Sequence, residues 1–166
     1  MAEPPHVENY RSNHAEVIRL IEIHTQLGGA TPGRKHKMEV LNKSGIVLLV
    51  ACWEAYVEDL VATAFDRMLT AATSPNVFPD SVLTLSTKEL KKSLDDREIW
   101  KLSGDGWKSV LKTHRDHVFK RHVGNFNTPK ADQIDGLFLS LLGLKTLSNG
   151  WKWQGMGVRR QRKLTP

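Results

Sequence analysis

The stretch GIVLLVACWEAYVEDL, residues 45–60, decides the fold class because it contains the longest apolar run of the chain. Apolar residues continue to recur every three or four positions around it, which predicts one long central helix from about Met38 to about Leu69. We expect its buried seam to consist of Ile46, Val50, Trp53, Val57, Leu60, Ala64 and Met68. The apolar run Gly45 to Trp53 is too short to cross a bilayer and acids follow it at once, so we interpret it as a buried helix segment.

The segment upstream of the central helix is predicted to be helical as well. Its apolar positions share one face from Val7 to Leu27, and Gly28 and Gly29 end it. The stretch GGATPGRKHK, residues 28–37, combines glycine, proline and basic residues, which is typical of a linker. It lacks the hydroxyl residue and the preceding strand that a phosphate-binding loop needs, so the linker interpretation is preferred.

Downstream of the central helix, three further helices are predicted. The prolines of SPNVFPD break the pattern, and Ser86 opens S-T-K-E, a capping box that predicts the start of a short helix. A longer helix carries Trp107, Val110, Leu111, His114 and Val118 on one face, and Gly124 ends it. In the last helix we expect Thr128 as the cap and Pro129 at the first position, with Gly143 at the end. Its apolar residues recur at helical spacing and predict one buried face: Ile134, Leu137, Phe138, Leu141 and Leu142.

Taken together, these patterns predict an all-α fold, a compact bundle of at least five helices around the long central one, because no alternating strands joined by a tight turn occur. The expected organisation is an N-terminal helix and basic linker over 1–37, a helical core over 38–153 and a basic tail over 154–166. With 166 residues, of which 40% are hydrophobic and 25% charged, the chain has the size of one domain.

Targeting and redox signals are sparse. The N-terminus MAEPPHVENY has no basic start followed by an apolar run, so we expect a cytoplasmic protein. The single Cys52 cannot form an intramolecular disulfide and is expected to pack as a small hydrophobic residue.

Positive charge is concentrated at the C-terminal end. The formal net charge is +6, and the segment 145–166 contains six Lys or Arg residues and no acid. Arg159, Arg160, Arg162 and Lys163 are therefore candidates for binding the phosphate backbone of a nucleic acid. A solvated basic end is the alternative interpretation.

The stretch RDHVFKRH, residues 115–122, offers candidate catalytic residues. Seven residues are nearly two helical turns, so Arg115 and His122 share a helix face about 10 Å apart along the axis. An arginine can hold a phosphate oxygen while a histidine moves a proton, which suits cleavage of a phosphodiester. The alternative is a solvated basic face whose C-terminal histidine is favoured by the helix dipole.

Other chemistry finds little support in the sequence. His114 and His117 have a spacing that metal sites use, but no cysteine and no well-placed third ligand accompany them. His114 is expected to be a core histidine with a hydrogen bond. No serine or cysteine lies in a recognisable nucleophile motif, and we expect neither a metal nor another cofactor.

Several ordered landmarks resemble a known family. They are ACWEAYVEDL at 51–60, GDGW at 104–107, NFNTP at 125–129, LGL at 142–144 and WKWQG at 151–155. From about Met38 to Trp153 the chain resembles the HEPN superfamily, specifically its RiboL-PSP-type branch. The resemblance implies a small all-α domain, often a homodimer, many of whose relatives are metal-independent endoribonucleases that act as toxins or in antiphage defence.

The resemblance also implies where catalysis occurs. Each protomer contributes an R-x4-6-H motif to a site at the dimer interface, in which a polar residue commonly follows the arginine. Arg115, Asp116 and His122 fit this motif literally, although they precede NFNTP, where the family pattern does not place catalysis. The family's motif is expected on a further helix after the W-x-W segment, and this chain stops about where that helix should begin.

Two functions therefore stay open. One is an RNA-cleaving protein of the toxin or antiphage type, with a cognate antitoxin or another protein as partner. The other is a non-catalytic module that binds RNA or dimerises. The absence of the motif from its expected position favours the second, and the family resemblance favours the first.

Overall fold

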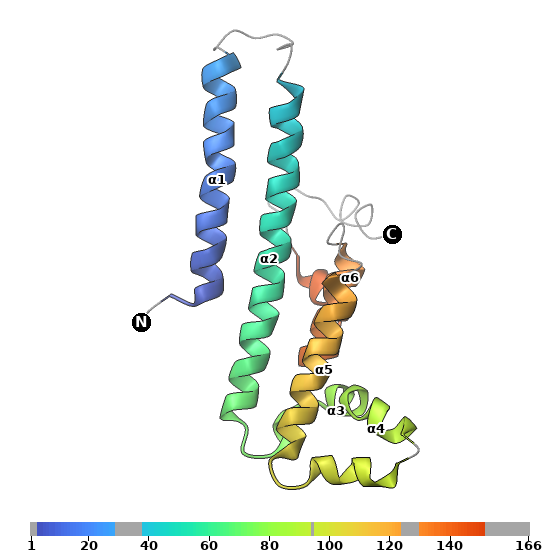
Figure 1. The fold of residues 1–166 in the computed structure, drawn as a ribbon. Helices are drawn as coiled ribbons and strands as arrows, with labels where there is room; N and C mark the ends of the chain where they lie inside the picture. Colours follow the sequence, from blue (N-terminus) through green and yellow to red (C-terminus); the bar gives the residue numbers. More distant parts are fainter. Residues whose placement is uncertain (1–2, 29–37, 94, 124–129, 152–166) are drawn as a thin grey trace. The chain divides into compact units, whose positions relative to one another are not determined.

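The computed structural model describes residues 3–28, 38–93, 95–123 and 130–151. Every regular element within these residues is a helix, which confirms the predicted all-α class (Figure 1). The chain divides into two compact units, Met1–Leu60 and Val61–Pro166. The boundary falls inside the longest helix, α2 (Glu39–Ala71), so this helix contributes to both units.

The first unit is a pair of helices, α1 (Pro5–Gly28) and the part of α2 up to Leu60, which run antiparallel (Figure 1). Side chains near the start of α1 join them: Asn9 donates a hydrogen bond to Asp59 over 3.1 Å. The ring centroids of Tyr10 and Tyr56 are 5.1 Å apart. Both helices were predicted, and their ends agree within two residues, the usual uncertainty of a helix end.

The predicted burial of α2 is partly wrong. Ile46 and Val47 are 65% and 67% exposed, although they belong to the apolar run. The run is apolar around the whole helix, and within the described part of the first unit only α1 lies beside it, so one neighbour cannot cover every side. Further along, the buried residues are Val61, Phe65 and Leu69, each one position after the predicted Leu60, Ala64 and Met68.

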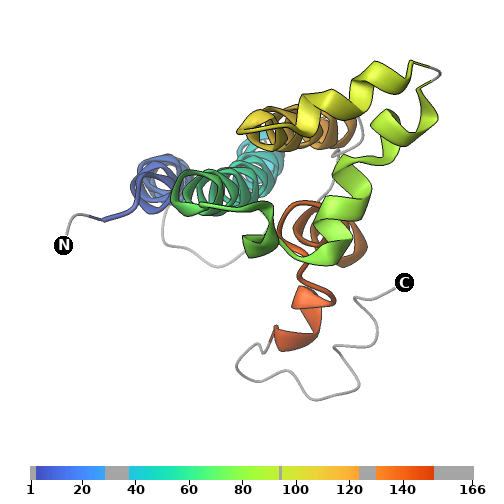
Figure 2. The same ribbon diagram turned by 90° about the horizontal axis from the view of Figure 1, so that it is seen from below.

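The second unit holds the larger hydrophobic core. In it α6 (Ala131–Leu142) packs against α3 (Asp80–Ser86) and α5 (Gly106–Val123), as Figure 2 shows from below. The apolar face predicted for α6 is confirmed, because Ile134, Leu137, Phe138, Leu141 and Leu142 are all buried. The aromatic ring of Phe65 meets that of Phe78, with centroids 5.4 Å apart.

Short helices fill the segment between α2 and α5, and the predicted cap there is wrong. They are the 3₁₀ helix η1 (Pro75–Val77), α3, α4 (Lys88–Lys92) and the 3₁₀ helix η2 (Asp96–Leu102). Ser86 is the last residue of α3, and its hydroxyl donates to the carbonyl oxygen of Leu83 over 2.9 Å. It therefore closes one helix, because a serine hydroxyl can also bond back to the preceding turn.

The start of α6 also differs from the prediction. The helix begins at Ala131, with Lys130 as its N-cap residue, two positions after the predicted first residue. The backbone N–H of Lys130 donates to the side-chain oxygen of Gln133 over 3.2 Å, so a glutamine supplies the local bond expected from Thr128. Gly124, Thr128 and Pro129 themselves lie outside the described residues.

Two glycines of the sequence landmarks hold the helices of the second unit close together. A Cβ atom on Gly106 would overlap with the carbonyl oxygen of Lys101, so the turn from η2 into α5 requires glycine. Gly143 ends α6 with φ of 68°, and the N–H of Leu144 after it donates to Phe138. The last short helix, η3 (Leu147–Gly150), is tied back to α6 by two hydrogen bonds between Ser148 and Asp135.

Candidate phosphate-binding site on α5

Helix α5 carries all three predicted catalytic residues, Arg115, Asp116 and His122. Its apolar positions Trp107, Leu111 and Val118 are buried in the second unit, which fixes which sides of the helix remain accessible. The helix is continuous from Arg115 to His122, so the two residues are separated by about 10 Å along its axis. The predicted helical spacing of the pair is therefore present.

The guanidinium of Arg115 is engaged with two carboxylates. Its Nη1 bonds to Asp66 on α2, while Nε and Nη2 donate to Asp116 over 3.1 Å and 2.9 Å. The side chain is 25% exposed, so these bonds are partly withdrawn from water. Charge-assisted bonds of this kind orient a guanidinium firmly. Arg115 therefore joins α5 to the second-unit part of α2 and points its donors at acids.

His122 lies in the last turn of α5 and is half-buried. Burial lowers the pKa of its imidazole below the usual value, and the positive charge of the adjacent Arg121 lowers the pKa further. The neutral form is thus favoured at neutral pH, which is the form that can accept a proton.

His114 behaves as the sequence predicted. Its Nε2 lies 3.0 Å from the carbonyl oxygen of Ser140 on α6, and the ring is half-buried. Burial lowers the pKa of His114, so the neutral tautomer that carries the proton on Nε2 can donate to this carbonyl. This contact links α5 to α6, and it occupies the Nε2 atom with a backbone carbonyl.

A cleft of about 910 Å³ lies on another side of α5, entirely within the second unit, and we call it the α5 cleft. It is lined from α3, α4, η2, α5 and α6 by Leu85, Ser86, Lys88, Leu90, Glu98, Lys101, Gly106, Ser109, Val110, Thr113, His114, His117, Val118, Lys120, Arg121 and Ser140. Neither Arg115 nor His122 lines it. Sequence reasoning missed the cleft, and its one readable signal was the recurrence of basic residues at 117, 120 and 121.

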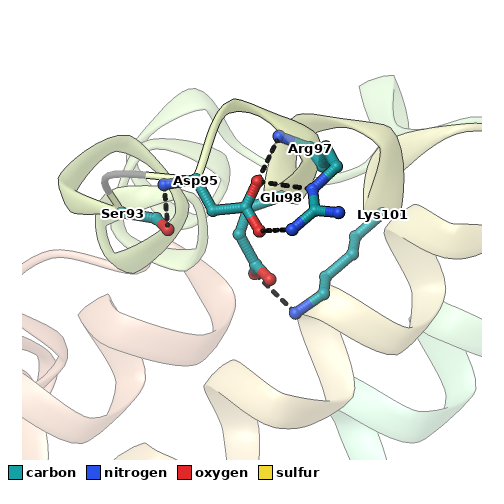
Figure 3. A network of polar contacts seen from close by, with 5 residues as sticks. All are labelled: Ser93, Asp95, Arg97, Glu98 and Lys101. Carbon is teal, nitrogen blue, oxygen red and sulfur yellow. Dashed lines mark hydrogen bonds and ion pairs between the residues drawn. The ribbon is translucent and has the colours of Figure 1, made fainter.

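The α5 cleft has a strongly positive lining. Among the described lining residues, Glu98 is the one acid, whereas the cationic residues include Lys88, Lys120 and Arg121. Glu98 is already paired with Lys101 within η2, and Asp95 next to it binds Arg97 through two side-chain hydrogen bonds (Figure 3). Within the described part of the chain, no acid pairs with Lys88, Lys120 or Arg121, which leaves these three charges facing solvent.

The remaining predictions of site residues and targeting have separate outcomes. Arg159, Arg160, Arg162 and Lys163 lie outside the described residues, so their role in nucleic-acid binding stays a prediction. Across residues 3–28, 38–93, 95–123 and 130–151, no three His, Cys, Asp or Glu side chains gather where they could hold a metal ion. None of the described helices is long and apolar enough to cross a membrane.

Comparisons with other proteins agree with the resemblance found in the sequence. Neither the curated proteins nor the solved structures contain a significant match. The family model described as RiboL-PSP-HEPN matches residues 11–154, which is most of the chain and includes α1 from residue 11 onward and the whole of α2, α5 and α6. The protein therefore belongs to the RiboL-PSP-HEPN family.

Proposed function

We propose that this HEPN domain binds RNA and does not use Arg115 and His122 to cut it. The claim that Arg115 and His122 do not cut RNA rests on the pairing of Arg115 with Asp66 and Asp116. A catalytic arginine must present its guanidinium to a phosphate, whereas here a phosphate would have to displace two carboxylates that also repel it. Family membership supports the link to RNA, because HEPN domains are often ribonucleases.

A second candidate is the ribonuclease itself, of the toxin or antiphage type. One observation favours it: the lowered pKa of His122 keeps the imidazole neutral, as a general base requires. Arg115 and Asp116 would have to separate before the arginine could neutralise a scissile phosphate. We therefore rank this activity second for Arg115, Asp116 and His122.

RNA is the first partner that we propose. The tail residues Arg159, Arg160, Arg162 and Lys163 would add sequence-independent contacts to the RNA backbone. A homodimer, and a cognate antitoxin or other protein partner, are further proposals that come from the family alone. Sedimentation of the purified chain tests the homodimer, which would have twice the mass of the 18.8 kDa chain.

The test of the proposal is incubation of the purified chain with a mixed RNA pool in EDTA. Three proteins are compared: wild type, His122→Ala, and His24→Ala on α1 as the matched control. We expect all three to retard the RNA on a native gel and to leave its length unchanged. Cleavage by wild type and by His24→Ala but not by His122→Ala would establish the ribonuclease instead.

A further inference from the structure

We propose that the α5 cleft is the site where this domain holds single-stranded RNA, with Lys88, Lys120 and Arg121 binding its phosphates. The inference rests on the proposed RNA-binding function and assigns it to particular residues. It places RNA on a different side of α5 from Arg115, because neither Arg115 nor His122 lines this cleft.

The cations on the two sides of α5 differ in their partners. Arg115, outside the cleft, is paired with two acids. Within the cleft, Lys101 is paired with Glu98. Lys120 and Arg121, by contrast, are exposed and, within the described residues, have no acidic partner. Unpaired cations that share one concave surface are the arrangement that attracts a polyanion, because the surrounding walls concentrate their field.

The cationic residues of the α5 cleft come from three different segments. Lys120 and Arg121 lie in the last turn of α5, Lys88 begins α4, and Lys101 belongs to η2. A chain of phosphates lying along the cleft would therefore meet positive charge contributed by more than one segment. Glu98 neutralises Lys101 in part (Figure 3).

The apolar lining indicates unpaired nucleotides. Leu85, Leu90 and Val110 contribute apolar surface to the cleft, and Ser109 and Thr113 add hydroxyl groups. Flat bases that are splayed out of a single strand can bury one face on such side chains and hydrogen-bond with their edges. A volume of about 910 Å³ lies within the range of pockets that enclose small ligands.

Duplex RNA suits this site poorly. A double strand keeps its bases stacked inside and is recognised across about 16 base pairs by contacts to phosphates and 2′-hydroxyls. Such recognition needs a broad surface, whereas the apolar and cationic residues of the α5 cleft line one concave site. The structure therefore favours a single strand over a duplex.

The test is the affinity of a fluorescein-labelled single-stranded RNA of about ten nucleotides, measured by anisotropy. We expect Lys120→Glu/Arg121→Glu to bind about tenfold or more weakly than wild type. The matched control is Lys112→Glu/Lys145→Glu, which makes the same charge change at exposed positions outside the cleft and should lose much less. If the charge reversal impairs folding, as circular dichroism would show, Lys120→Gln/Arg121→Gln takes its place.

Each outcome has a defined meaning. Equal losses in the two double variants, or none in Lys120→Glu/Arg121→Glu, would overturn the cleft as the site while RNA binding by the domain stands. Absence of RNA binding by wild type would overturn the proposed function itself. An unlabelled duplex of the same sequence should compete poorly, and equal competition would contradict the preference for a single strand.

Discussion

Arg115 on α5 forms an ion pair with Asp66 on α2, although the two residues are 49 positions apart in the sequence. The same guanidinium also bonds to Asp116, its neighbour in the chain. The guanidinium that makes Arg115 fit a catalytic motif in the sequence thus joins α5 to α2 within the second unit. The side of α5 that carries this contact therefore has a structural role, and we assign RNA binding to the side that lines the α5 cleft.

Replacing Arg115 should therefore affect stability more than RNA binding. Arg115→Ala removes the guanidinium that pairs with Asp66 and Asp116 and leaves both carboxylates without it. We expect the free energy of unfolding to fall by about 1 kcal/mol, because the pairs are only partly buried. Arg67→Ala, an exposed arginine on the same helix as Asp66, is the control and should change stability little. Urea unfolding measures both, and equal stability of Arg115→Ala and wild type would contradict the structural role.

Gly143 should be intolerant of a side chain. Its φ of 68° is unfavourable for other residues, and a Cβ atom there would come within 2.6 Å of the ring of Pro79. We expect Gly143→Ala to cost about 1 to 3 kcal/mol of stability, measured by urea unfolding. Gly136→Ala in the middle of α6 is the opposite control, since nothing lies within 4 Å of its Cβ position. It should stabilise by about 0.5 to 1 kcal/mol, and equal effects of the two would contradict this packing.

Stability should fall as the pH is lowered below neutrality. Burial lowers the pKa values of His114 and His122 in the folded protein, so the unfolded chain binds more protons as pH falls below about 6.5. The contribution of the two histidines to the free energy of unfolding is therefore complete above about pH 6.5 and is lost as the pH falls. His114→Gln keeps an N–H donor and cannot titrate, so its melting temperature should depend less on pH between about 5 and 7. Parallel curves for the variant and wild type would contradict this cause.

The basic tail can be tested independently of the cleft. Replacing Arg159, Arg160, Arg162 and Lys163 by Gln should flatten the dependence of RNA affinity on salt. Each phosphate contact contributes about 0.7 to the slope of log K against log salt for a single strand, so four contacts predict a change of about 3. An unchanged slope would exclude these residues from the interface.

Much of the fold was predictable from local patterns. The apolar face of α6 ends at Gly143 and needs no knowledge of its neighbours, so periodicity was sufficient there. In α2 the same reasoning was right for Val57, which is buried, but chose the wrong residues further along the helix. Two adjacent stripes are apolar there, and only packing shows that Phe65 lies inside. Ser86 shows a similar limit, since a serine can close a helix or open one.

The candidate site was less predictable, for a physical reason. The residues Arg115 and His122 were found because a motif is local, but the carboxylate of Asp66 that engages Arg115 comes from another helix. The α5 cleft is assembled from five helical segments, and Lys88 becomes its neighbour only through the packing of α3 and η2 against α5. Sequence spacing alone does not predict that Lys88 and α5 line the same cleft.

The most direct test of the account is one incubation of the wild-type chain with an end-labelled single-stranded RNA in EDTA, analysed in parallel on native and denaturing gels. The account predicts a retarded complex whose RNA is still of full length. RNA that is shortened by wild type but not by His122→Ala, or RNA that is not retarded at all, would contradict it.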